Sequence, residues 1–240
     1  MVVMSISSAW GLPTGRWNLY NAHMSEKCLK CFRPVQSCYC SDIHPIQTGV
    51  KFIFLMHPKE AYKQKTGTGR LASLSLVDSE IIIAQSFDHN KRTQQLISDS
   101  SYFPMLLYPG KDAHYAESFD FQAQREGRTL LVFLVDATWR LARQMIFRSP
   151  SLQKLPKLSF SHEYRSAFAI KTQPEDYCLS TIETSYYLIK ELQKSGICHT
   201  EADPSGLMEV FQKMVKFQED CRDERLGRGP TEPLDRSLKD

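Results

Sequence analysis

A carboxylate, a hydroxyl and a large aromatic side chain follow one another directly after the most apolar stretch of this chain. The run "TLLVFLV" is followed by Asp136, Ala137, Thr138 and Trp139. Asp is unfavourable in a strand, and a carboxylate is costly to bury without partners. The placement of Asp136 therefore indicates a functional requirement at the end of a buried strand.

Four cysteines within thirteen residues form a second group with chemical potential. They follow the spacing C-x2-C-x6-C-x-C and are Cys28, Cys31, Cys38 and Cys40. Four thiolates can close a tetrahedral zinc site, and a bound ion would order a segment that has too few apolar residues to fold alone. We predict a zinc module here; an iron–sulfur cluster and four unconnected reduced thiols are the alternatives.

The overall composition is typical of a globular cytosolic protein and does not identify a partner. The chain has 240 residues, of which 42% are hydrophobic and 24% charged, and its net charge is +3. A mildly basic body is compatible with RNA binding, but many enzymes share it. No apolar run approaches the ~20 residues of a membrane span, and the N-terminus lacks the pattern of a signal peptide. Seven cysteines, an odd number, favour a reducing cytoplasm over a disulfide framework.

Short apolar runs alternate with helical patterns from about residue 48 onward. We expect strands at 50–57, 80–87, 104–110, 129–136 and 157–164, and helices at 69–77, 138–146, 179–196 and from an N-cap at Asp203. This alternation predicts an α/β fold with a mostly parallel sheet covered on both faces. Ligands of such sheets bind beyond the carboxyl ends of the strands, where Asp136 lies. The fingerprints GxGxxG and GxxxxGK[ST] are absent, which argues against dinucleotide-binding and P-loop proteins.

The block "DATWRLARQM" at 136–145 resembles the signature of the DTW-domain family when it is taken together with three further blocks. These are "HPKEAYKQKTGTGRL" (57–71), "LLYPG" (106–110) and "LSTIET" (179–184), in the family's order. The cysteine cluster matches as well. The family pattern has Asn where this chain has Gly67, and it is richer in Arg just before the last block.

This family includes the tRNA-uridine aminocarboxypropyltransferases and is related to the SPOUT methyltransferases. The resemblance implies a SPOUT-like α/β domain with a trefoil knot that holds S-adenosylmethionine. It also implies transfer of the 3-amino-3-carboxypropyl group to N3 of a uridine in tRNA (acp3U formation). The by-product of that reaction is 5′-methylthioadenosine.

The resemblance points to Asp136, Thr138 and Trp139 as the catalytic residues. Uridine N3 keeps its proton at neutral pH, and the Asp136 carboxylate can accept or hold that proton. The alternative for Asp136 is the N-cap of the following helix. Thr138 is expected either to orient a substrate group or to cap the helix. Trp139 is expected either to stack on a planar ring or to pack in the core.

Two further groups of residues are expected to bind the substrates. The end of one strand and the start of a helix, whose backbone N–H groups suit a carboxylate, are expected to hold the donor. These donor residues are Tyr108, Pro109, Gly110, Leu179, Ser180 and Thr181. The residues expected to contact tRNA phosphates are Lys65, Arg70, Arg140 and Arg143. A flexible loop and a solvated helix face are the alternatives for the basic residues, and Glu183 is assigned to a capping box with Ser180.

We therefore expect an N-terminal segment with a zinc module (1–45), a DTW/SPOUT-like catalytic domain (46–226) and a flexible tail (227–240). The expected protein is a cytoplasmic, non-membrane transferase that acts on tRNA with S-adenosylmethionine as donor. A SPOUT-type RNA methyltransferase and a non-catalytic zinc-containing RNA-binding protein are the alternatives.

Overall fold

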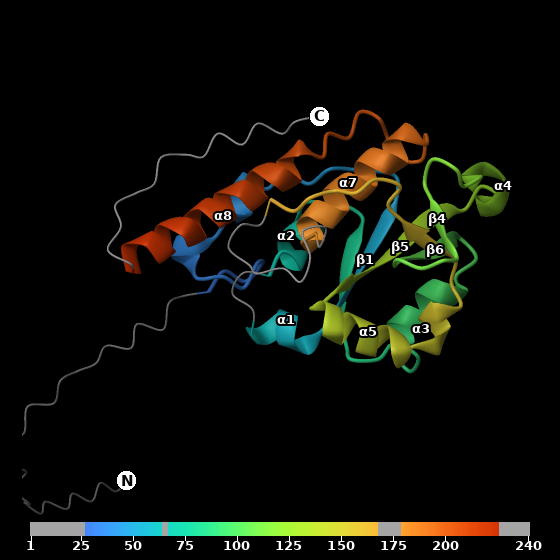
Figure 1. The fold of residues 1–240 in the computed structure, drawn as a ribbon, viewed down its shortest axis with the longest axis horizontal. Helices are drawn as coiled ribbons and strands as arrows, with labels where there is room; N and C mark the ends of the chain where they lie inside the picture. Colours follow the sequence, from blue (N-terminus) through green and yellow to red (C-terminus); the bar gives the residue numbers. More distant parts are fainter. Residues whose placement is uncertain (1–26, 64–66, 168–178, 226–240) are drawn as a thin grey trace, which may run out of the picture.

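The fold is built on one six-stranded parallel sheet (Figure 1). The computed structural model describes residues 27–63, 67–167 and 179–225. Every pair of adjacent strands is parallel. The strand order is β2 (Ser79–Ile83), β1 (Lys51–Met56), β5 (Thr129–Asp136), β3 (Tyr102–Leu107), β6 (Lys157–Ser159) and β4 (Ala113–Tyr115). The prediction of an α/β fold with a mostly parallel sheet is confirmed.

The alternation of side chains along β5 explains why the sheet has a hydrophobic layer on each face. Leu130, Val132 and Leu134 belong to one buried cluster. Leu131 and Phe133 belong to the other. Successive side chains of a strand point to opposite faces, so a strand that is covered on both sides must be apolar throughout. Asp136 ends this strand and lies beside Met56 of β1 in the sheet.

The helices divide between the two faces of the sheet (Figure 1). The first layer contains α2 (Gly69–Leu74), α7 (Thr181–Lys194) and α8 (Ser205–Arg225), whose buried side chains join the first cluster. The second contains α3 (Lys91–Ser98), α5 (Trp139–Phe147) and α6 (Pro150–Gln153). The short helices α1 (Pro58–Lys63) and α4 (Phe121–Arg125) follow β1 and β4. No helix in the described part of the chain is long and apolar enough to cross a membrane.

Several elements differ from the sequence expectations, among them the strand expected at 80–87, which ends at Ile83, and the strand expected at 104–110, which ends at Leu107. The strand expected at 157–164 ends at Ser159, and residues 160–167 are irregular. The helices α1, α3, α4 and α6 and the strand β4 were not predicted. The helix expected at 69–77 ends at Leu74.

The cysteine segment lies against the first helical layer. It contains two short 3-10 helices, Val35–Ser37 and Cys40–Asp42. The carboxylate of Asp42 accepts a hydrogen bond from Lys213 of α8. Arg33 also contacts α8, because its Nη2 lies 3.1 Å from the sulfur of Met214. Residues 1–26 of the expected N-terminal segment and the whole of the expected flexible tail lie outside the described residues.

Candidate active site

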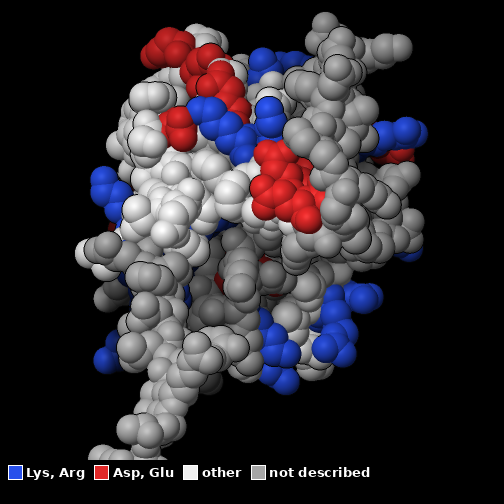
Figure 2. Space-filling model, turned by 90° about the vertical axis from the view of Figure 1, so that its left-hand side faces the viewer, with Lys and Arg blue, Asp and Glu red and all other residues white. Residues whose placement is uncertain are grey.

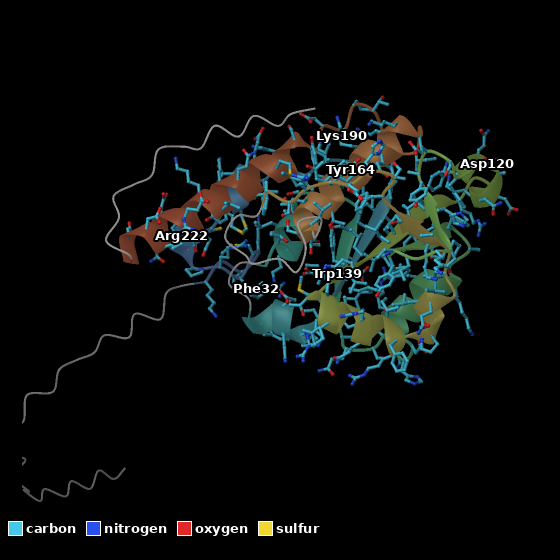
Figure 3. The ribbon with its side chains drawn as sticks, in the orientation of Figure 1. Phe32, Asp120, Trp139, Tyr164, Lys190 and Arg222 are labelled. Carbon is cyan, nitrogen blue, oxygen red and sulfur yellow. The ribbon has the colours of Figure 1, made fainter. Side chains whose placement is uncertain are left out.

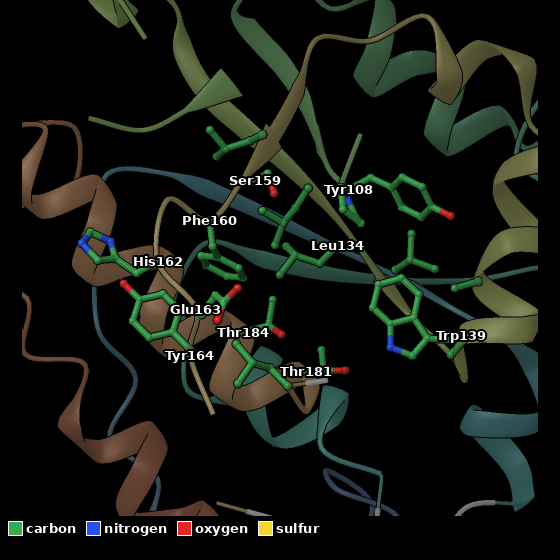
Figure 4. A pocket seen from close by; sticks show the side chains of 17 residues that line it. Tyr108, Leu134, Trp139, Ser159, Phe160, His162, Glu163, Tyr164, Thr181 and Thr184 are labelled. Carbon is green, nitrogen blue, oxygen red and sulfur yellow. The ribbon is translucent and has the colours of Figure 1, made fainter. Parts of the chain in front are cut away.

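A cavity of about 370 Å³ lies beyond the carboxyl ends of β3, β5 and β6. Figure 4 shows Trp139 and Tyr108 on one side of it, Tyr164 on the other, and Thr181 and Thr184 between them. The lining residues are Leu107, Tyr108, Pro109, Leu134, Val135, Ala137, Trp139, Ala142, Leu158, Ser159, Phe160, His162, Glu163, Tyr164, Leu179, Thr181 and Thr184. A concave, mostly apolar site with a few polar groups suits a small organic ligand.

Asp136 is not among the residues that line this cavity, but its carboxylate is bonded to a lining residue, Thr181. Only 6% of Asp136 is exposed. Its Oδ1 accepts a hydrogen bond of 2.6 Å from the hydroxyl of Thr181 at the start of α7. The N-cap of α5 is Thr138, not Asp136. The helix-cap alternative for Asp136 is therefore wrong, and its carboxylate ties the end of β5 to α7.

Gly69 packs directly against the Asp136 carboxylate. A Cβ atom at position 69 would lie 2.1 Å from Oδ2 and 2.7 Å from Cγ of Asp136. Such distances are far below a van der Waals contact, so only glycine permits this approach. The sequence suggested residues 65–70 as a phosphate-contacting or flexible loop, and Gly69 of this stretch packs against the carboxylate. The contact was missed because it joins residues 67 positions apart.

Thr138 and Trp139 occupy different environments. Thr138 is exposed, makes no side-chain hydrogen bond to the helix that it caps, and is not among the residues that line the cavity. Trp139 is 40% exposed and lines the cavity. An indole ring on the wall of a site can stack on a planar ring of a ligand. The structure therefore agrees with the stacking expectation for Trp139 more than with a place in the core.

The start of α7 has the capping box that the sequence predicts. Ser180 is the N-cap, and its N–H donates a 2.8 Å hydrogen bond to Oε2 of Glu183. Glu183 is 1% exposed and also accepts the N–H of Ala167 at 2.6 Å. One carboxylate therefore caps α7 and holds the segment that follows β6. Thr181 and Leu179 line the cavity beside this helix start, whereas Ser180 is not among the lining residues.

An aromatic wall closes the far side of the cavity, and the sequence did not indicate it. Phe160 and Tyr164 meet edge to face with ring centroids 5.5 Å apart, and Tyr164 stacks on Tyr187 at 3.9 Å. The Tyr164 hydroxyl donates a 3.0 Å hydrogen bond to Oε1 of Glu191, which is 5% exposed. Burial, and then this hydrogen bond, raise the pKa of Tyr164. The hydroxyl therefore stays protonated as a donor, and α7 fixes the ring in place.

The end of β3 forms another part of the wall. Tyr108 and Pro109 line the cavity, whereas Gly110 does not and instead lies beside Asp112. Burial raises the pKa of the Tyr108 phenol, and the positive charge of Arg143 partly opposes this shift. Two of the three residues expected at this strand end, Tyr108 and Pro109, therefore line the cavity.

The residues expected to contact tRNA lie in two different places in the structure. Arg140 and Arg143 are exposed on α5, and Arg143 is close enough to affect Tyr108. Arg70 is half-buried and lies 4.4 Å above the ring of Phe32, and its Nη2 donates to the carbonyl of Ala61 at 3.3 Å. Lys65 lies outside the described residues. Figure 2 shows the side of the molecule that lies on the left in Figure 1. Lys and Arg side chains lie above and below a hollow there, and Asp and Glu lie mainly above it.

The four cysteines of the N-terminal cluster are placed as ligands of one ion. Their sulfur atoms all lie within 4.8 Å of one another. The sulfurs of Cys28 and Cys40 are 3.8 Å apart, and those of Cys31 and Cys38 are 3.7 Å apart. A tetrahedron with Zn–S bonds of about 2.3 Å has sulfur atoms about 3.8 Å apart, so the cluster fits zinc.

The surroundings of these sulfur atoms differ: those of Cys28 favour a thiolate, whereas burial raises the pKa of the Cys31 and Cys40 thiols. Backbone hydrogen bonds from Cys31 and then Lys30 lower the pKa of the Cys28 thiol to about 6. The guanidinium of Arg33, only 7% exposed, lies near the cluster and offers a balancing positive charge. Metal binding requires deprotonated thiols, so a bound cation would have to displace the protons of the more buried cysteines.

A parallel sheet with a cavity at its carboxyl ends and a buried carboxylate beside that cavity defines an α/β protein with the site of an enzyme. The chain belongs to the DTW domain family, whose model matches residues 25–219. The predicted family is therefore confirmed.

Curated relatives of this chain carry one common name, tRNA-uridine aminocarboxypropyltransferase 2. The protein from Drosophila melanogaster is 32% identical over 174 residues, which cover 70% of this chain and 67% of the relative. The Mus musculus protein is 26% identical over 218 residues, which cover 89% of this chain and 69% of the relative. The Macaca fascicularis protein is 23% identical over 217 residues, with coverages of 89% and 69%. No solved structure gives a significant match.

Proposed function

We propose that this protein transfers the 3-amino-3-carboxypropyl group of S-adenosylmethionine to N3 of a uridine in tRNA. Membership of the DTW domain family and the shared name of the relatives support this reaction. The observation that carries it in this chain is the buried Asp136 carboxylate at the edge of an apolar cavity. The proposed products are acp3U in tRNA and 5′-methylthioadenosine.

Asp136 acts on the proton of uridine N3. The nitrogen attacks the carbon of the aminocarboxypropyl group that is bonded to sulfur, and the C–S bond breaks with its electron pair going to sulfur. The sulfonium loses its charge and leaves as a thioether, while the N3 proton passes to the Asp136 carboxylate. The Thr181 hydroxyl, which donates to Oδ1 at 2.6 Å, orients this carboxylate.

The remaining residues bind and orient the two substrates. The donor's carboxylate binds at the N-terminal end of α7, where Leu179 and Thr181 line the cavity. Tyr108 and Tyr164 bound an apolar volume for the rest of the donor, and Trp139 offers its indole to the uracil or the adenine ring. The exposed Arg140 and Arg143 bind tRNA phosphates beside the site.

Zinc at the four cysteines, a cytoplasmic location and a trefoil knot belong to the same proposal. The sulfur spacing supports zinc, and the free cysteines of the described residues suit a reducing compartment. The knot implied by the family's SPOUT relationship stays a prediction, because residues 168–178, between β6 and α7, lie outside the described residues. The division into 1–45, 46–226 and 227–240 also stays a prediction.

The by-product distinguishes this transfer from methylation, since both reactions use one donor. Purified protein is incubated with S-adenosylmethionine and unmodified tRNA, and the nucleosides are analysed by mass spectrometry. We expect 5′-methylthioadenosine to accumulate in step with acp3U. Formation of S-adenosylhomocysteine alone, in step with tRNA modification, would establish an RNA methyltransferase instead. Binding of tRNA without either by-product would establish a non-catalytic RNA-binding protein.

A further inference from the structure

The cysteine module, residues 28–42, contacts the segment 67–70, in which Gly69 packs against Asp136. Arg33, between Cys31 and Cys38 in the sequence, is 7% exposed. Its Nη2 donates a 2.9 Å hydrogen bond to the carbonyl oxygen of Gly67. Gly67 lies two residues before Gly69, whose Cα packs against the Asp136 carboxylate. A buried, charged donor on a main-chain carbonyl fixes backbone rather than side-chain position.

A second contact joins the same two segments. The ring of Phe32, the residue before Arg33, lies under the guanidinium of Arg70 at 4.4 Å. Arg70 follows Gly69 directly and belongs to the first turn of α2. The segment 67–70 is thus held at both of its ends by neighbouring residues of the cysteine module. Figure 3 shows Phe32 of this module beside α1 and α2.

The module is in turn anchored to the body of the protein independently of this segment. Lys213 of α8 binds the carboxylate of Asp42, and the sulfur of Met214 lies 3.1 Å from Nη2 of Arg33. The described contacts therefore form a continuous path from α8 through Arg33 to Gly67 and on to Asp136.

We propose that Arg33 is a positioning residue, through which the cysteine module holds the segment 67–70 against the Asp136 carboxylate. This role deepens the proposed function, since the segment that Arg33 holds encloses the group that acts on uridine N3. A purely structural role would stabilise the module alone and leave segment 67–70 unchanged. A change at Arg33 should therefore speed hydrogen exchange in the segment 67–70 under the proposed role, and only within the cysteine module under the purely structural role.

The test compares Arg33→Met with Lys213→Met by hydrogen–deuterium exchange of the peptide that covers 67–76. Methionine keeps an apolar chain in the buried place of Arg33 but has no donor for Gly67. Lys213→Met removes another cation that ties α8 to the module, without touching the segment. The amide of Ala72, which donates to the carbonyl of Thr68 at 2.9 Å, reports the order of the junction. Zinc content and thermal melts are measured on the same samples.

We expect about tenfold faster exchange in 67–76 for Arg33→Met, with unchanged zinc content and unchanged exchange in α7. Lys213→Met should exchange like the wild type. Arg33→Gln, which retains an N–H donor, should recover part of the protection. Equal exchange of Arg33→Met and wild type in 67–76 would overturn the proposal, and so would faster exchange confined to 28–40. If Arg33→Met loses zinc or does not fold, Arg33→Gln decides between the same two outcomes.

Activity supplies a separate reading that keeps this proposal distinct from the proposed function. In a protein that forms acp3U, Arg33→Met should lower kcat by about 10–100-fold and change the KM for S-adenosylmethionine by less than about threefold. A wild type that forms no acp3U would refute the proposed function, while the exchange comparison would still decide the role of Arg33.

Discussion

Gly69→Ala is expected to damage the site while leaving the fold intact. An alanine Cβ at this position would lie 2.1 Å from Oδ2 of Asp136 and 3.1 Å from Cε of Met56. Real Cβ contacts are at least 3.0 Å, so the carboxylate or the segment 67–70 must move by roughly 1 Å. Misplacement by about 1 Å in a catalytic site costs about 100-fold in rate.

The effect of Gly69→Ala on stability should be small, because two contributions oppose each other. Ala is favoured over Gly within a helix by about 1 kcal/mol, and Gly69 is the first residue of α2. Overpacking against a buried group costs about 1–3 kcal/mol. We therefore expect a net loss of no more than about 2 kcal/mol, seen as a decrease in Tm of a few degrees.

Gly206→Ala is the matched control for this experiment. Gly206 lies in the first turn of α8, and no atom lies within 4 Å of an added Cβ. This variant should be as stable as the wild type or more stable, with unchanged activity. The assay is the single-turnover rate of acp3U formation, with S-adenosylmethionine binding measured by calorimetry. A Gly69→Ala protein that reacts within threefold of the wild type would refute the packing of Gly69 against a working carboxylate.

Three further variants test other parts of the protein. Thr181→Val removes the hydrogen-bond donor to Asp136 Oδ1, so it should lower the free energy of unfolding by about 1–3 kcal/mol and slow the transfer. A melting temperature and a transfer rate like those of the wild type would contradict a role for this hydrogen bond. Cys38→Ser should lower the zinc content below the expected one ion per chain, and elemental analysis that finds no zinc in untreated protein would end the metal assignment. Replacing Arg140 and Arg143 by Gln should weaken tRNA binding and reduce its salt dependence by up to about two units of slope, and an unchanged slope would place the tRNA elsewhere.

The sequence predicted best those elements whose signals are local. The strand β5 has the predicted bounds because its apolar run is continuous from Leu130 to Val135. The helix α7 begins at the predicted place because Ser180 and Glu183 form a capping box within one turn. By contrast, α3 is short and mostly polar ("KRTQQLIS"), and its N-cap Asn90 was overlooked. A short polar helix gives almost no periodic signal, so its packing decides its structure.

The same distinction holds for the site. The placement of Asp136 at a strand end indicated a functional requirement, the resemblance to the family supplied its catalytic role, which stays a prediction, and the cysteine cluster was predicted from its spacing. Residues 160–164 were expected to continue a strand, but Tyr164 is held by Glu191, which lies 27 residues later in the chain. The approach of Gly69 to Asp136 and the bond from Arg33 to Gly67 are likewise long-range contacts. No local pattern marks such pairs, and only the folded chain brings them together.

Asp136→Asn is the measurement that tests the central claim most directly. Asn keeps the size of the side chain but removes the charge and the basicity that accept the N3 proton. Loss of a general base costs about 10²–10⁴-fold in rate, or about 3–5 kcal/mol of activation free energy. We expect a folded variant that still binds S-adenosylmethionine and forms acp3U at least about 100-fold more slowly in a single turnover. A variant that releases 5′-methylthioadenosine and forms acp3U within a few-fold of the wild-type rate would contradict the account.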